Sequence, residues 1–253
     1  MIPDDVPLQI GSLLFERVDQ IDLTGPFEVL SRIPNATHHI YGKTPEMVRD
    51  VNGLRLTPDA TLADAPQLDV LHIPGGHGQE DLMSDDQVLE WIRTQAAGAR
   101  IVFSVCTGAL LCGAAGLLVG RRATTHWASF HLLPLYGAIA VDQRVVVDER
   151  FVFASGVTAG LDGALQVAAE LRGDHVAQRI QLDIAYAPEP PFNSGTPMTA
   201  PPAVLAEAKA AVTGITRQRE MTAQEIAARL RIAVPNTGST AMPRERGARS
   251  QEP

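Results

Sequence analysis

Hydrophobic residues along the chain form short continuous runs, and these runs alternate with longer segments of helical spacing. The apolar runs predict buried strands at residues 8–15, 38–41, 54–56, 69–73 and 101–104. Helices are predicted between them, most clearly over 85–97, where apolar residues fall three and four positions apart. Strands that alternate with helices favour a mostly parallel sheet with helices on both faces. The pattern therefore predicts an α/β fold.

The second half of the chain continues this alternation and then changes character. It predicts a hairpin of strands 144–147 and 151–154, followed by helices at 158–171, 174–186, 203–212 and 222–232. The intervening segment 187–202, APEPPFNSGTPMTAPP, holds six prolines and predicts a long ordered loop or flap. We therefore expect a single α/β domain over residues 1–212, a helical extension over 213–232 and a disordered tail over 233–253.

Composition narrows the classes of function. The 253 residues carry a formal net charge of −8, from 29 acidic and 21 basic residues, so the chain has no electrostatic footprint for nucleic acid. No apolar run approaches the roughly 18 residues of a membrane span, and the acidic start MIPDDVPLQI does not resemble a secretory leader. Two cysteines, Cys106 and Cys112, are too few for a disulfide framework, and their six-residue spacing on one predicted helix disfavours a bridge. We expect a cytoplasmic protein with no nucleic-acid or membrane partner.

Cys106 lies where a strand-like run meets a helix-like run, in the segment IVFSVCTGALLCGAAGLL. A sharp turn exposes its central side chain, and the following helix directs free N–H groups and the positive end of its dipole at the sulfur. Both effects favour the nucleophilic thiolate and predict a lowered thiol pKa. The alternative is a buried structural cysteine, which is the more common fate of a single cysteine.

Two further segments lie at predicted strand ends. Gly75 and Gly76, followed by His77, end the strand at 69–73, and residues without side chains let backbone N–H groups approach a ligand; an ordinary turn is the alternative. Asp22 follows the first strand, where spacing alone slightly favours helix capping over catalysis. Because ligands of parallel sheets bind at the carboxyl ends of strands, the glycine turn and Cys106 are candidates for one shared site.

The histidines give weaker signals. His126 is the obvious base for a Cys–His pair, but a histidine next to Trp127 is more often packed and hydrogen-bonded. No HExxH motif occurs, and His126 and His131 are five residues apart, off a single helical face, so no metal site is expected. Asp162 is expected in the first turn of a helix, with a structural role.

Five segments together resemble the PfpI/ThiJ-like (class I glutamine amidotransferase-like) superfamily, namely DLTGP (22–26), IPGG (73–76), SVCTGALLCGAAGLLVGRRATTHW (104–127), SGVTAGLDGAL (155–165) and AYAPEPPFNSGTP (185–197). The resemblance covers about residues 8–212 and implies a flavodoxin-like three-layer sandwich. Within the superfamily the chain is most similar to the isocyanide hydratases, which implies a homodimer acting on a small isocyanide. The reaction needs no cofactor or metal.

The resemblance also implies roles for individual residues. Cys106 matches the nucleophile on its elbow, and Asp22 matches the acidic residue that faces it, which reverses the preference for capping. Asp22 is then expected to orient water and move protons, while N–H groups around Gly76 and of Thr107 resemble oxyanion donors. Thr107 replaces the histidine of the protease-like relatives and argues against a peptidase. No general-base role is transferred to His126.

Attack by Cys106 on an isocyanide is expected to give a thioimidate, from which water releases an N-substituted formamide. Two alternatives remain at this point. One is a glyoxalase-like or deglycase-like hydrolase, or a stress-linked chaperone, as found among relatives with the same elbow. The other is a DNA-binding regulator, since TAQEIAARLRI (222–232) looks like the opening helix of such a module, although the acidic charge disfavours it.

Overall fold

Seven strands form the central sheet of the computed structural model, which describes residues 2–233. Their spatial order is β10 (Val145–Asp148), β11 (Phe151–Ala154), β7 (Ile101–Val105), β6 (Val70–Ile73), β1 (Leu8–Leu14), β2 (Ala36–Gly42) and β5 (Ala60–Thr61). All neighbouring strands run parallel except the β10–β11 hairpin. Strands β6, β7 and β11 are buried along their whole length, because helices cover both faces of the sheet.

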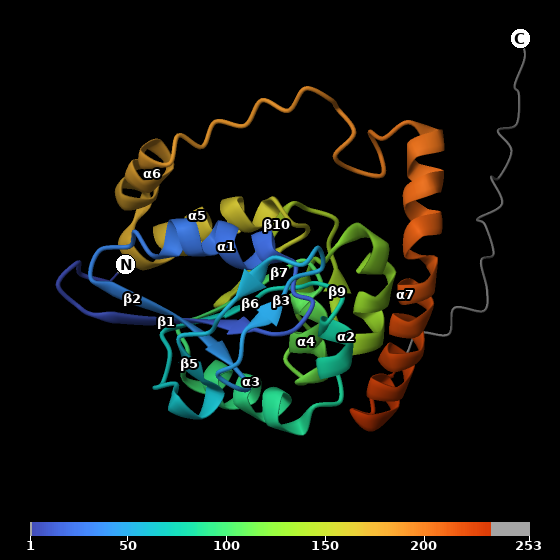
Figure 1. Cartoon of the computed structure of the whole chain (residues 1–253), viewed down its shortest axis with the longest axis horizontal. Coiled ribbons are helices and arrows are strands. Elements are labelled where there is room, and N and C mark those ends of the chain that lie inside the picture. Colours follow the sequence, from blue (N-terminus) through green and yellow to red (C-terminus); the bar gives the residue numbers. More distant parts are fainter. Residues whose placement is uncertain (1, 234–253) are drawn as a thin grey trace, which may run out of the picture.

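Helices form the two outer layers. One face carries α1 (Gln20–Leu30), α5 (Ala159–Arg172) and α6 (Asp174–Asp183). The other carries α2 (Gln79–Leu82), α3 (Asp86–Gly98), α4 (Gly108–Ala114), the 3₁₀ helix η2 (Trp127–Tyr136) and α7 (Pro202–Arg229). Figure 1 shows the two groups on opposite sides of the sheet. A separate hydrophobic cluster fills the space on each side, so the predicted three-layer sandwich is confirmed.

Short elements complete the described chain. They are the antiparallel pair β3 (Val48–Arg49) and β4 (Arg55–Leu56), the parallel pair β8 (Arg122–Ala123) and β9 (Ile139–Ala140), and the 3₁₀ helix η1 (Leu62–Asp64). The strand predicted at 54–56 therefore lies outside the main sheet. Helix α6 ends at Asp183, earlier than the predicted residue 186.

The C-terminal helices differ most from expectation. The helices predicted at 203–212 and 222–232 are one continuous helix, α7, and the domain boundary predicted at residue 212 lies inside it. Gly214 and its threonine neighbours lower helix propensity, which explains the predicted break. Packing overrides that weakness, because α7 lies along η2 and buries Ala223, Ile226 and Ala227.

The proline-rich segment joins α6 to α7 without any helix or strand, as predicted, and Figure 1 shows it arching between the two. Phe192 and Met198 on this segment are 79% and 87% exposed. The predicted tail, 233–253, lies outside the described part of the chain except for its first residue. Among residues 2–233, no helix combines the length and apolar character that a membrane span requires.

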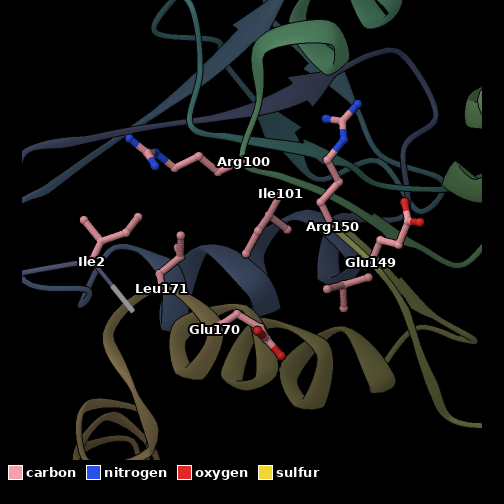
Figure 2. Close-up of a pocket in the computed structure, with 8 residues that line it drawn as sticks. Ile2, Arg100, Ile101, Glu149, Arg150, Glu170 and Leu171 are labelled. Carbon is pink, nitrogen blue, oxygen red and sulfur yellow. The ribbon is translucent and has the colours of Figure 1, made fainter.

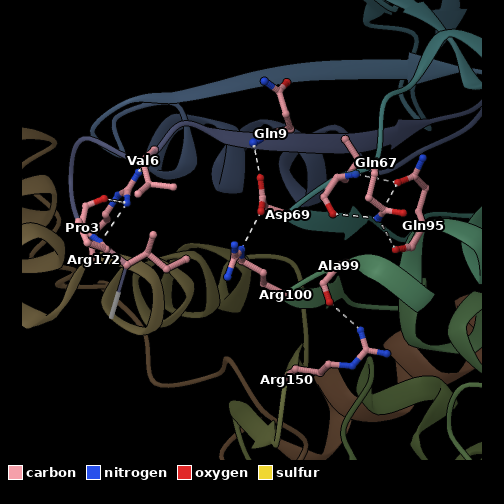
Figure 3. Close-up of polar contacts among 12 residues, drawn as sticks. Pro3, Val6, Gln9, Gln67, Asp69, Gln95, Ala99, Arg100, Arg150 and Arg172 are labelled. Carbon is pink, nitrogen blue, oxygen red and sulfur yellow. Dashed lines mark hydrogen bonds and ion pairs between the residues drawn. The ribbon is translucent and has the colours of Figure 1, made fainter.

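Arginines secure the amino-terminal edge of the sheet (Figure 3). Arg172, 5% exposed, donates to the carbonyl oxygens of Val6 and Pro34, which ties the start of the chain to α5. Arg100 pairs with Asp69 at 2.8 Å, just before β7 and β6. These contacts satisfy polar groups at the edge opposite the candidate site, so they are structural.

Candidate active site

Three neighbouring parallel strands bring the predicted site residues to one edge of the sheet. Strand β7 ends at Val105, directly before Cys106, and β6 ends at Ile73, before the glycine turn. Strand β1 pairs with β6 and leads into α1, which carries Asp22 in its first turn. The carboxyl ends of parallel strands meet at the same edge, and the predicted shared site is therefore assembled there.

The backbone of Cys106 is held in an uncommon conformation. Its φ of +55° lies in the left-handed region that residues with a side chain rarely adopt. The Cys106 N–H donates to the carbonyl oxygen of Ala154 at 2.9 Å, and the Thr125 hydroxyl donates to the Cys106 carbonyl at 2.7 Å. These two bonds fix the strand-to-helix turn, and such strain is typical of functional sites.

Gly75 lets the two turns approach each other closely. A Cβ at this position would lie 2.6 Å from the Thr107 nitrogen and 2.9 Å from Asp22 Oδ2, both too close for any side chain. The Gly75 N–H instead donates to Asp22 Oδ2 at 3.0 Å. The glycine is therefore required by packing at the site.

We expect Gly75→Ala to destabilise the protein by about 1–3 kcal/mol, the usual cost of overpacking a buried position. Thermal or urea unfolding measures the change. Gly214→Ala is the matched control, since no atom lies within 4 Å of its Cβ position and alanine favours the helix. Equal stability of the Gly75 and Gly214 variants would contradict the packing argument.

Asp22 is fully buried beside the thiol. Burial, and then the charge of Asp19, raise its pKa to about 8, while hydrogen bonds with Gly75 and Cys106 act in the opposite direction. Its Oδ1 atom has no hydrogen-bond partner among the described residues. Asp19, and not Asp22, caps α1 by accepting the N–H of Ile21 at 3.3 Å, so the capping alternative is wrong. At neutral pH the Asp22 carboxyl is protonated and has one oxygen free.

The lowered thiol pKa expected from the sequence is wrong. Burial, and then the nearby Asp22 carboxyl, raise the pKa of the Cys106 thiol well above its ordinary value, and Asp19 adds to this. The Thr107 N–H and Arg219 lower it. The sequence pattern places the turn but does not show that Cys106 is only 6% exposed and lies next to a buried carboxyl group.

Thr107 joins the two turns through its hydroxyl group. The Gly76 N–H donates to Thr107 Oγ1 at 3.1 Å, and the hydroxyl lies 3.3 Å from the Gly76 carbonyl oxygen. The N–H groups of Gly75 and Gly76 are therefore both engaged within the protein, and not directed at a ligand as the sequence suggested. The Thr107 N–H hydrogen-bonds the Cys106 sulfur, and its role as an oxyanion donor stays a prediction.

Two histidines border the site. His126 precedes η2, and its Nδ1 accepts the N–H of Ala128 at 3.4 Å, so it caps that helix. Burial, and then Arg219 and His77, lower the pKa of His126 to about 4, which keeps the ring neutral. The pKa of His77 is also lowered, by burial and then by Arg219. Asp162 lies in the first turn of α5, as predicted.

A cavity of about 110 Å³ opens over the Cys106 sulfur. It is lined by Asp19, Val51, Gly76, His77, Cys106, Thr107, His126, Ala128, Val157, Val212, Ile215 and Arg219. The last three come from α7, which the sequence assigned to the end of the domain and to an extension beyond it. Helix α7 is a wall of the site, and Arg219 and Asp19 are the polar residues that sequence reasoning missed.

Another cavity, of about 290 Å³, lies at the opposite edge of the sheet (Figure 2). Its lining includes Arg100 and Ile101 at the start of β7 and Glu170 and Leu171 at the end of α5. It contains none of the candidate site residues. Within the described part of the chain, no three His, Cys, Asp or Glu side chains cluster in a way that could hold a metal ion.

Comparison with known proteins agrees with this geometry. Residues 9–170 match the DJ-1/PfpI family. The chain belongs to the DJ-1/PfpI family. The match spans the strands and turns that carry Asp22, the glycine turn and Cys106, and it confirms the superfamily resemblance read from the sequence motifs.

Individual members of the DJ-1/PfpI family differ in their similarity to this chain. Isonitrile hydratase from Pseudomonas putida is 50% identical over 225 residues, covering 89% of this chain and 99% of the relative. The glutathione-independent glyoxalase DJR-1.2 of Caenorhabditis elegans is 28% identical over 134 residues, covering 52% of this chain and 72% of the relative. A crystal structure of a ThiJ/PfpI family protein from Pseudomonas syringae superposes with a TM-score of 0.85 at 37% identity, covering 88% and 93% of the two chains.

Proposed function

We propose that this protein is an isocyanide hydratase, a lyase that adds water to an isocyanide and releases an N-substituted formamide. The observation that carries the proposal is the Cys106 thiol beside a buried Asp22 carboxyl that keeps its proton at neutral pH. The 50% identity to the Pseudomonas putida isonitrile hydratase over nearly its whole length supports the same activity.

The first step forms a covalent bond to the enzyme. The sulfur of Cys106 attacks the terminal carbon of R–N≡C while Asp22 gives its proton to the same carbon, and the thiol proton passes to Asp22 in its place. The product is a thioimidate, R–N=CH–S–Cys106. A buried carboxyl with a raised pKa suits this step, because the carbon becomes basic as the sulfur adds to it.

The second step releases the product. Water adds to the thioimidate carbon, the C–S bond breaks, one proton of water reaches the substrate nitrogen and the other returns to the thiol. Asp22 orients the water and moves these protons through Oδ1, which is unpartnered among the described residues. Apolar side chains at the cavity wall, Val157, Val212 and Ile215, suit an uncharged substituent on the isocyanide.

A glyoxalase-like activity is the second candidate, favoured by the similarity to the Caenorhabditis elegans glyoxalase. Two residues weigh against it under the superfamily resemblance: Asp22 where many members have glutamate, and Thr107 where the protease-like members have histidine. The segment 222–232, which suggested a DNA-binding module, does not open a separate unit, because its residues 222–229 continue α7, which packs on η2.

An absorbance assay separates the two enzyme candidates. Purified protein is offered an aryl isocyanide and methylglyoxal side by side. We expect the isocyanide to be consumed with formation of the aryl formamide, and methylglyoxal to persist, because the proposed step needs a carbon that accepts sulfur and proton together. Consumption of methylglyoxal alone would reject the hydratase proposal.

A homodimer and a cytoplasmic location are part of the proposal. The proline-rich segment supports the dimer, since it exposes the large apolar side chains of Phe192 and Met198.

A further inference from the structure

Arg219 is a buried arginine in the middle of α7. Its side chain is 5% exposed, yet none of the ion pairs found among residues 2–233 includes it. Its two hydrogen bonds go to neutral acceptors, the carbonyl oxygen of Gly76 at 3.1 Å and the Ser129 hydroxyl at 3.3 Å. Buried charges are normally paired, because an unpaired ion in the interior is costly. The guanidinium therefore has no negatively charged group among its hydrogen-bond acceptors.

The cavity over Cys106 offers such a partner. Arg219 and Cys106 line the same cavity of about 110 Å³. The carbonyl oxygen that Arg219 holds belongs to Gly76, whose N–H donates to the hydroxyl of Thr107, the residue after the nucleophile. Gly76 thus links Arg219 to the nucleophile elbow through two hydrogen bonds, and the Arg219 side chain lines the cavity.

We propose that Arg219 is a positioning residue of the active site, which fixes the Gly76 turn against Thr107 and supplies the positive charge that stabilises the Cys106 thiolate. The effect on substrate rests on the proposed hydration, in which the same charge stabilises negative charge that develops as sulfur adds to carbon. The effect on the thiol does not depend on any substrate.

Other titratable groups lie near the Cys106 sulfur, and their effects on the thiol pKa add to that of Arg219. Asp22 and Asp19, from α1 and its cap, raise the pKa of the thiol, and burial raises it further. His77 and His126 line the cavity but both have lowered pKa values, which leaves them neutral. Among these groups Arg219 is the permanent positive charge.

Contacts of Arg219 on its other side point the same way. Burial lowers the pKa of Arg219, whereas Cys106, and after it Glu80 and Tyr136, raise it. One oxygen of Glu80 accepts the hydroxyl of Thr222, and the other, Oε2, has no hydrogen-bond partner among the described residues. Glu80 does not line the Cys106 cavity, so the thiolate, once it forms, is the negative group that Arg219 meets inside that cavity.

The test is the pH dependence of Cys106 alkylation by iodoacetamide, followed by mass spectrometry in a Cys112→Ala background. We expect Arg219→Gln to raise the midpoint by about one pH unit and to slow alkylation at pH 7 by about tenfold. Arg219→Lys keeps the charge and should restore most of the rate. Arg219→Met, which keeps the apolar stem, is the second neutral variant if the Gln variant does not fold.

Arg217→Gln is the matched control, because Arg217 is exposed on the same helix and does not line the Cys106 cavity. It should leave the midpoint unchanged. Equal midpoints in the parent protein and in folded neutral Arg219 variants would overturn the proposal. If the midpoint shifts while the wild-type protein hydrates no isocyanide, the proposed function fails and the role of Arg219 stands.

Discussion

Replacement of Cys106 by serine is expected to lower isocyanide turnover by at least about 10³-fold, the scale seen when an enzyme loses its nucleophile. A hydroxyl group needs a base to become nucleophilic, and neither His126 nor Asp22 supplies one. His126 has a pKa lowered to about 4 and is committed to capping η2. Asp22 is protonated at neutral pH, so it also cannot take the serine proton.

The measurement is the initial rate of aryl formamide formation for the variant and the wild-type protein at one pH. Cys112→Ala serves as the control, since Cys112 is a fully buried thiol on α4 that packs in the core and lies outside the cavity. It should retain most of the activity and show that loss of a thiol alone is not harmful. A Cys106→Ser protein that keeps most of its turnover would reject the covalent mechanism.

Much of the fold could be predicted because a strand whose two faces are both buried is built mainly of apolar residues. The strands β6, β7 and β11 consist mainly of apolar residues, and the sequence pattern predicts each within one residue of its bounds. Cys106 and Gly75 could be found for the same reason, since each follows the end of such a run. Sheet order then brings them together without further information.

The electrostatics of the site could not be predicted in this way. Whether Cys106 is activated depends on its burial and on Asp22, which lies 84 positions earlier in the chain. Arg219 is still harder to find, because one arginine in a helix of ordinary polarity gives no local signal. The packing of α7 against η2 brings Arg219 to the cavity. The same packing keeps α7 helical across Gly214, a residue that lowers helix propensity.

Asp22→Asn is expected to lower turnover by about 10²–10⁴-fold, the usual contribution of general acid–base catalysis. Asparagine has nearly the same shape, and its carbonyl oxygen can accept the Gly75 N–H as Asp22 Oδ2 does. It cannot deliver a proton to the substrate carbon or take one from water. The loss should appear mainly in kcat, because the substitution leaves the apolar cavity walls intact.

The same substitution should stabilise the protein, with a sign set by the raised pKa of Asp22. Between pH 3.8 and about 8 the unfolded chain has lost this proton while the folded protein retains it. The free energy of unfolding of the wild-type protein therefore falls as pH rises through that window. An asparagine side chain does not titrate, so we expect the variant to be more stable than wild type by about 1–3 kcal/mol at pH 8 and to lack this dependence.

Urea unfolding at pH 5 and pH 8 measures both parts of the prediction. Asp86→Asn is the matched control, because Asp86 also lies in the first turn of a helix but is exposed to solvent. Its replacement should leave turnover and the pH dependence of stability as they are in the wild-type protein. Unaltered turnover in the Asp22→Asn variant would remove Asp22 from the mechanism. A variant destabilised most at pH 8 would show instead that Asp22 is ionised in the folded state, because only a carboxylate that stabilises the fold is missed more at high pH than at low pH.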